Sequence, residues 1–186
     1  MKVAVYCGSR PGNNPVFVDK ARELGTWFGS HGIDVVFGGG HVGLMGIVAD
    51  ATLAAGGRVY GVIPESLRDR ELAHDRLTEL HVVRDMHQRK ARMAELADGF
   101  LALPGGIGTL EEMFEAWTWG QLGFHHKPCG LYNINGFYDP LLAMVQTMQE
   151  NGFLNQEYID MVIRAETPEA VVEAFGNYRP PHEKWT

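Results

Sequence analysis

The sequence is poor in cysteine and in basic residues. Its two cysteines, Cys7 and Cys129, each lie in an apolar run, a setting typical of small buried thiols in a reducing compartment. Lysine and arginine together number 16 against 23 aspartate and glutamate residues, and the formal net charge is -7. This shortage of positive charge opposes non-specific binding to nucleic acid or to an anionic membrane. Any phosphate group must therefore be bound by a local arrangement of donors.

Long apolar segments are also missing. No run approaches the length of a membrane-spanning helix, and the N-terminus shows no basic region followed by the apolar core of a signal peptide. We therefore expect a cytoplasmic protein with no membrane partner. With 45% hydrophobic residues among 186, the chain can bury one sizeable core. We expect a single domain over residues 1–176 and a loose, polar C-terminal tail over 177–186.

Short apolar runs alternate with helical patterns along the chain. We expect strands at 2–7, 33–37, 58–63, 77–83, 100–103 and 128–132. We expect helices at 16–31, 44–55, 85–97, 109–122, 141–151 and 170–175. This alternation predicts an α/β fold, a Rossmann-like open parallel sheet with helices on both faces. The charged segment 65–76 is expected to form a loop with a short helical piece that could cover a site.

A glycine-rich turn follows the expected strand at 100–103. The run 104–108, PGGIG, prevents regular structure, and Thr109 with Glu112 makes a capping-box pattern that predicts a helix starting at Thr109. Glycines let backbone N–H groups approach an oxygen, and the unpaired first-turn donors of a helix favour negative charge. In an open parallel sheet, ligands bind at the carboxyl ends of the strands. We therefore predict a phosphate site at this turn.

A second glycine-rich turn, from Gly38 to Gly43, satisfies the pattern G-x-G-x-x-G. It has three interpretations: a dinucleotide site, a turn needed for close helix packing, or a contribution to a smaller nucleotide site. An NAD site needs an acidic residue at the end of the next strand. That strand ends at Pro64, with Glu65 only beyond it, and this disfavours the dinucleotide interpretation.

Two motifs carry a resemblance to a known family. Residues 104–112, PGGIGTLEE, resemble the PGGxGTxxE motif of the Lonely Guy family of cytokinin-activating phosphoribohydrolases. Residues 86–90, MHQRK, resemble the MHxRK segment of that family, in the same order and spacing. Members are often labelled lysine decarboxylases, but no lysine here has a recognisable setting for pyridoxal phosphate. We expect no cofactor.

The resemblance implies hydrolysis of the N-glycosidic bond of nucleoside 5'-monophosphates to a free base and ribose 5-phosphate. The implied substrates are N6-substituted adenosine monophosphates and AMP, bound by the domain at 1–176. The resemblance further implies that Arg89 and Glu112 are the catalytic pair. The candidate substrate-binding residues are Ser9, Glu71, Lys90, Gly105, Gly106, Ile107, Gly108, Thr109, Glu111 and Thr118.

The implied catalytic residues also have purely structural interpretations. Glu112 could only complete a capping box, and Arg89 could only pair with Asp85 at i, i+4 on a helix surface. A non-catalytic nucleotide- or molybdenum-cofactor-binding carrier is a rival function, which the presence of both residues disfavours. A nicotinamide-dependent oxidoreductase is a second rival, which lacks the acidic residue for the ribose.

Metal binding and self-association can also be addressed from the sequence. His87, His125 and His126 lack a third ligand at a sensible spacing, so we expect no metal site. The helix expected at 109–122 carries large apolar residues around more than one side, among them Phe114 and Trp117. Such a distribution is typical of a helix buried on several sides, as at a subunit interface. Together with the resemblance, it predicts a homodimer.

Overall fold

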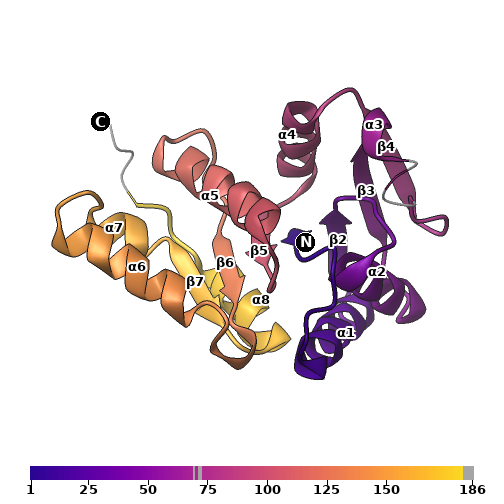
Figure 1. The fold of residues 1–186 in the computed structure, drawn as a ribbon, viewed down its shortest axis with the longest axis horizontal. Coiled ribbons are helices and arrows are strands. Elements are labelled where there is room, and N and C mark those ends of the chain that lie inside the picture. The colour runs from indigo at the N-terminus through magenta and orange to yellow at the C-terminus, as the bar shows by residue number, and fades with distance from the viewer. Residues whose placement is uncertain (69, 71–72, 182–186) are drawn as a thin grey trace.

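The computed structural model describes residues 1–68, 70 and 73–181 and contains one seven-stranded sheet (Figure 1). The strands are β1 (Lys2–Tyr6), β2 (Asp34–Phe37), β3 (Val59–Pro64), β4 (Glu79–Val83), β5 (Gly99–Ala102), β6 (Cys129–Tyr132) and β7 (Val162–Ala165). Their order is β4-β3-β2-β1-β5-β6-β7, and neighbouring strands are parallel throughout. The predicted Rossmann-like α/β fold is therefore confirmed.

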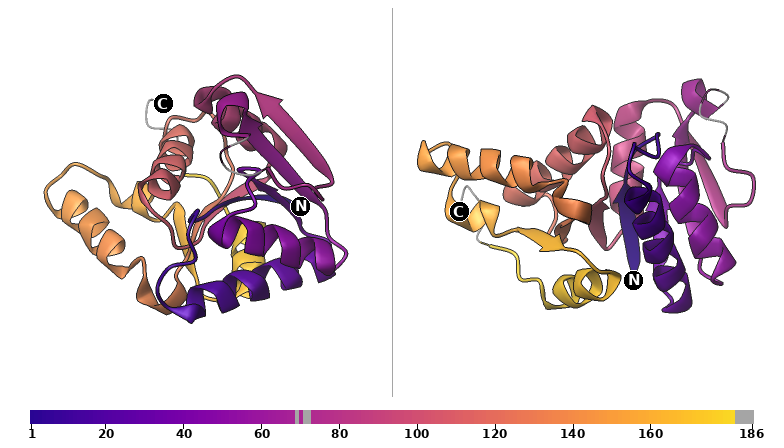
Figure 2. Two further views of the ribbon diagram at one scale, coloured as in Figure 1. Left: turned by 45° about the vertical axis from the view of Figure 1, so that its right-hand side comes forward. Right: turned by 60° about the horizontal axis from the view of Figure 1, so that its bottom comes forward.

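Helices cover both faces of this sheet. They are α1 (Pro15–Ser30), α2 (Gly43–Ala54), α3 (Glu65–Arg68), α4 (Met86–Leu96), α5 (Ile107–Gln121), α6 (Asp139–Glu150), α7 (Gln156–Ile159) and α8 (Pro168–Asn177), with a 3-10 turn η1 (Ile134–Gly136). One core joins the sheet to α1, α2 and α8, and the other joins it to α4, α5 and α6. Figure 2 shows the indigo and purple helices α1 and α2 lying side by side on one side of the sheet.

The central strand β1 shows why a continuous apolar run forms the middle of the sheet. Val3 and Val5 enter the core beneath α1 and α2, whereas Ala4 and Tyr6 enter the core beneath α4 and α5. Successive side chains of a strand point to opposite faces, so a strand covered on both faces must be apolar at every position. The sheet edge at the carboxyl end of β1 is thereby fixed in place between two layers of helices.

The start of α5 differs from the prediction. The helix begins at Ile107, its N-cap is the extended residue Gly106, and no side chain caps it. The capping box of Thr109 and Glu112 is therefore wrong, because the helix starts two residues earlier and Thr109 is buried in the first turn. Helix α4, by contrast, has a side-chain cap, because the Asp85 carboxylate accepts a hydrogen bond from the Gln88 N–H at 2.8 Å.

The C-terminal part holds elements that the sequence patterns did not indicate. Strand β7 and the short helix α7 were not predicted, and α8 starts at Pro168, earlier than expected. Strand β7 lies at the edge of the sheet and is only partly buried. An edge strand needs fewer apolar residues than a central one, so its sequence pattern is weak. Of the predicted tail, residues 182–186 lie outside the described residues. None of the helices that the structure describes is long and apolar enough to span a membrane.

Candidate active site

Three strand-to-helix loops are tied together at the carboxyl edge of the sheet. The Gly8 N–H donates to the Pro104 carbonyl at 3.1 Å, and the Leu44 N–H donates to the Gly8 carbonyl at 3.0 Å. A Cβ on Gly43, whose φ is +57°, would lie 2.3 Å from the Ser9 carbonyl carbon. These loops follow β1, β2 and β5, and they contact one another through backbone atoms. The edge is therefore a rigid platform whose geometry depends on glycine.

Arg89, in the first turns of α4, points into this platform. Its guanidinium is buried, with Nε donating to the Val62 carbonyl and Nη2 to the Gly38 carbonyl, each at 3.2 Å. Its Nη1 lies 3.9 Å from Oε1 of Glu112 on α5. The interpretation of Arg89 as a surface partner of Asp85 is therefore wrong. A buried guanidinium with backbone partners is held in one orientation, because moving it would leave a buried charge without hydrogen bonds.

The glycine-rich turn after β2 is explained by this contact. A Cβ on Gly38 would lie 1.8 Å from Nη2 of Arg89, so only glycine leaves room for the guanidinium. At the other end of the turn, Gly43 packs against the loop after β1. These contacts support close packing among the three interpretations of the turn from Gly38 to Gly43. The packing partners are the Arg89 side chain of α4 and the loop after β1.

A cavity of about 310 Å³ opens between these loops and the start of α5. The predicted residues that line it are Ser9, Arg89, Gly106, Ile107, Gly108, Thr109, Glu111 and Glu112. A Cβ on Gly106 or on Gly108 would meet no atom within 4 Å, so both glycines border open space. The first-turn N–H groups of a helix have no partner within the helix and carry its positive end. The cavity therefore combines an anion-binding end with a carboxylate and a guanidinium.

Other predicted residues lie away from this cavity. Lys90, also on α4, forms ion pairs with Glu111 and Glu115 of α5. Burial lowers the pKa of Lys90, but its hydrogen bonds with the two carboxylates outweigh burial and leave the pKa above its ordinary value. Thr118 is exposed near the far end of α5. Lys90 and Thr118 are absent from the lining of the cavity, and Glu71 lies outside the described residues.

Gly105 is close to the site but does not line this cavity. It borders an adjoining hollow of about 360 Å³, which shares Gly8, Ser9 and Gly106 with the cavity. A Cβ on Gly105 would lie 2.1 Å from Oγ1 of Thr109. The residue therefore allows the glycine turn to fold back against the first turn of α5.

The cavity also has lining residues that sequence reasoning missed. Met45 and Met86 contribute apolar walls from the first turns of α2 and α4. The usable signal was their position, because helices that follow strands in a parallel sheet begin at the binding edge. Cys7 lines the cavity too, and burial, followed by the charge of Glu112, raises the pKa of its thiol well above the usual range. Cys7 therefore stays protonated at neutral pH and is a poor nucleophile.

Known proteins resemble this chain in sequence and in fold. Residues 45–175 match the family model described as "Possible lysine decarboxylase". A cytokinin riboside 5'-monophosphate phosphoribohydrolase of Oryza sativa subsp. japonica is 46% identical over 182 residues, covering 98% of this chain and 75% of that protein. One of Arabidopsis thaliana is 45% identical over 183 residues, covering 98% and 86% respectively. The solved molybdenum cofactor binding protein of Rippkaea orientalis matches with a TM-score of 0.69 and 22% identity, covering 95% of each chain, which shows a shared fold.

The contact between Gly38 and Arg89 yields a prediction for stability. Gly38→Ala should lower the free energy of unfolding by about 1–3 kcal/mol, because the added methyl group overlaps the buried guanidinium. Gly176→Ala is the matched control, since that glycine lies in α8 with no atom within 4 Å of its Cβ position. The control should be neutral or slightly stabilising. Urea denaturation measures both, and equal stabilities of the two variants would contradict the packing role of Gly38.

Proposed function

The chain belongs to the family of cytokinin riboside 5'-monophosphate phosphoribohydrolases, and we propose from this premise how it hydrolyses the N-glycosidic bond of nucleoside 5'-monophosphates. The products are a free base and ribose 5-phosphate. The observation that carries the proposal is the placement of Arg89 and Glu112, 3.9 Å apart, beside one cavity at the start of α5. We assign N6-substituted adenosine monophosphates and AMP as the substrates.

The phosphate is assigned to the glycine turn and the first turn of α5. Gly106, Gly108 and Thr109 border the cavity at the positive end of this helix, where backbone N–H groups bind anions. Because open space surrounds the Cβ positions of both glycines, a phosphate can approach the backbone closely there. We also assign Ser9 and Ile107, which line the same cavity, to the substrate.

The glycosidic bond is assigned to the space beside Glu112. Side chains of a helix lean toward its N-terminus, so Glu112 reaches back over the turn that would hold the phosphate. Cleavage of the bond builds positive charge on the ribose ring, and a carboxylate beside C1' stabilises that charge and can hold the attacking water. Because α5 is capped at Gly106, Glu112 has no capping role that would explain its position.

Arg89 is assigned to orientation and charge balance. Its backbone hydrogen bonds fix the guanidinium, and its position beside Glu112 keeps that carboxylate oriented. Donors that are fixed before the substrate binds need no rearrangement during the reaction. This preorganisation is the main source of electrostatic catalysis. Lys90 is assigned an indirect role in the same site, because its ion pairs with Glu111 and Glu115 hold α4 against α5.

We further propose a homodimer, on the basis of exposed apolar residues other than those of the helix at 109–122. The Trp117 indole is buried within the chain and donates to the Tyr158 carbonyl at 2.8 Å, so it does not need a partner subunit to cover it. Phe124, Met144 and Phe153 are instead exposed by 73%, 52% and 86%. We assign these three side chains to the subunit contact, because a contiguous exposed apolar surface is what marks an interaction site. We also propose that residues 1–176 form one nucleotide-binding domain, which the continuous sheet supports. We propose the cytoplasm as the location of the protein.

The rival carrier function has weaker support. The molybdenum cofactor binding protein shares 22% identity and therefore only the fold, whereas the phosphoribohydrolases share 45–46% over nearly the whole chain. An arginine and a glutamate beside the cavity of about 310 Å³ serve hydrolysis, whereas a carrier has no use for such a pair. Formation of ribose 5-phosphate from AMP separates the two functions directly.

The phosphate site yields a prediction for substrate choice. AMP should be hydrolysed at least about a hundredfold faster than adenosine at equal low concentrations, because the phosphate anchors the ribose beside Glu112. Chromatography of released adenine measures both rates. Adding inorganic phosphate to the adenosine reaction controls for a general effect of anions. Equal turnover of AMP and adenosine would overturn the assignment of the glycine turn.

A second prediction concerns the carboxylate of Glu112. Glu112→Gln should lower kcat for AMP about a hundredfold or more, roughly 3 kcal/mol of transition-state stabilisation, because the amide keeps the shape and loses the charge. Glu95→Gln is the matched control, since Glu95 pairs with Arg92 at 2.9 Å on the exposed surface of α4. The control should keep the wild-type kcat, and wild-type activity in Glu112→Gln would refute the mechanism.

A further inference from the structure

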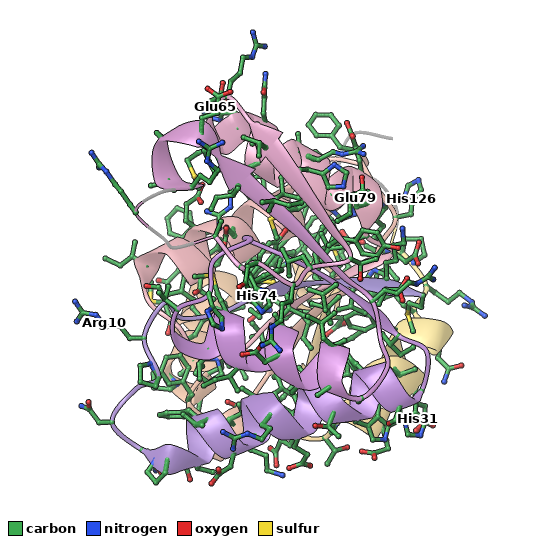
Figure 3. All side chains as sticks on the ribbon, turned by 90° about the vertical axis from the view of Figure 1, so that its right-hand side faces the viewer. Arg10, His31, Glu65, His74, Glu79 and His126 are labelled. Atoms are coloured by element: carbon green, nitrogen blue, oxygen red, sulfur yellow. The ribbon has the colours of Figure 1, made fainter. Side chains whose placement is uncertain are left out.

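A second group of ionisable side chains lies outside the cavity. His41 follows β2, Asp50 lies in α2, and His74 lies in the segment after α3. His41 Nε2 is 3.2 Å from Oδ2 of Asp50, and His74 Nε2 is 3.1 Å from its Oδ1. All three ligand atoms lie within 4.8 Å of one another. Figure 3 shows His74 beside helix α2.

The donor set is one that divalent transition metals prefer. Two imidazoles and one carboxylate bind zinc and its neighbours, with metal–ligand distances of about 2.0–2.2 Å. Ligands around one such ion lie roughly 3–4 Å apart, so the observed group needs only a small contraction. The His74 side chain is fully buried and His41 is 47% exposed, so one ligand is fixed and another faces solvent. An ion can therefore enter from the His41 side.

The same contacts also work as a hydrogen-bond network without an ion. The Arg76 N–H donates to Nδ1 of His74 at 3.2 Å, which places a proton on Nε2 of His74, facing Asp50. A metal ion on Nε2 takes the place of that proton, which moves to Nδ1 of the same ring, so the ring must turn Nδ1 away from the Arg76 N–H. The Arg76 guanidinium also contacts Oδ1 of Asp50 at 2.5 Å and can remain on one carboxylate oxygen while the other binds the ion.

We propose that His41, Asp50 and His74 form a binding site for a divalent transition-metal ion of the zinc class. The site joins three segments that lie far apart in sequence. The His74 N–H donates to the Gly39 carbonyl at 3.0 Å, next to Gly38, whose carbonyl holds Arg89. A bound metal ion would therefore link the segment after α3 to the turn that positions Arg89.

Direct binding measurements test this proposal. Protein treated with a chelator and dialysed should bind one Co²⁺ per chain, seen as visible absorption bands of a low-coordinate ion and as metal retained through gel filtration. Zn²⁺ should compete for the site and raise the melting temperature by roughly 5–10 °C at a hundredfold excess over its Kd.

Variants of the two more exposed ligands, His41 and Asp50, locate the site while the buried His74 itself is kept. His41→Ala and Asp50→Asn should each weaken Co²⁺ binding more than about tenfold, because each removes a ligand. His31→Ala is the control, since that histidine stacks on Trp27 at the end of α1 and should leave binding unchanged. No stoichiometric binding by the wild-type protein would overturn the proposal, as would equal binding by all variants.

Discussion

The burial of one guanidinium constrains the whole candidate active site. Arg89 carries a full charge at a position that is 7% exposed, and an unpaired charge there would cost several kcal/mol. Its partners are the Val62 carbonyl within β3, the Gly38 carbonyl after β2, and the Glu112 carboxylate on α5. The strands β2 and β3 and the helices α4 and α5 must therefore keep fixed positions relative to one another for the buried charge to be tolerated.

The rest of the edge supports this arrangement through backbone contacts. The chain of hydrogen bonds from Leu44 to Gly8 and from Gly8 to Pro104 ties three loops together, and each approach requires a glycine. Lys90 adds a second link between α4 and α5, directly beside the first in sequence and paired with Glu111 and Glu115. A carboxylate placed by such a frame needs little reorganisation when positive charge develops next to it. The contacts that make the sheet edge rigid are thus the same contacts that hold the charged groups of the site in place.

The sequence allowed much of this site to be predicted, but only where the signal is local. The strand, glycine turn and helix around residues 100–121 are contiguous, and Arg89 and Glu112 followed from two short motifs. The helix start at Ile107 was missed because Thr109 and Glu112 fit a capping box as well as they fit a cavity wall. The contact of Gly38 with Arg89 spans 51 residues, and that of His74 with Asp50 spans 24. Contacts of this range depend on the order of strands in the sheet, which alternation alone does not give.

The central claim is that the cavity holds a ribose 5-phosphate between the start of α5 and the Arg89–Glu112 pair. A crystal structure of the protein soaked with ribose 5-phosphate tests it most directly. We expect the phosphate within hydrogen-bond distance of the backbone N–H groups of Gly108 and Thr109, and C1' of the sugar beside the Glu112 carboxylate. A sugar phosphate bound elsewhere at full occupancy, with this cavity filled only by water, would contradict the account.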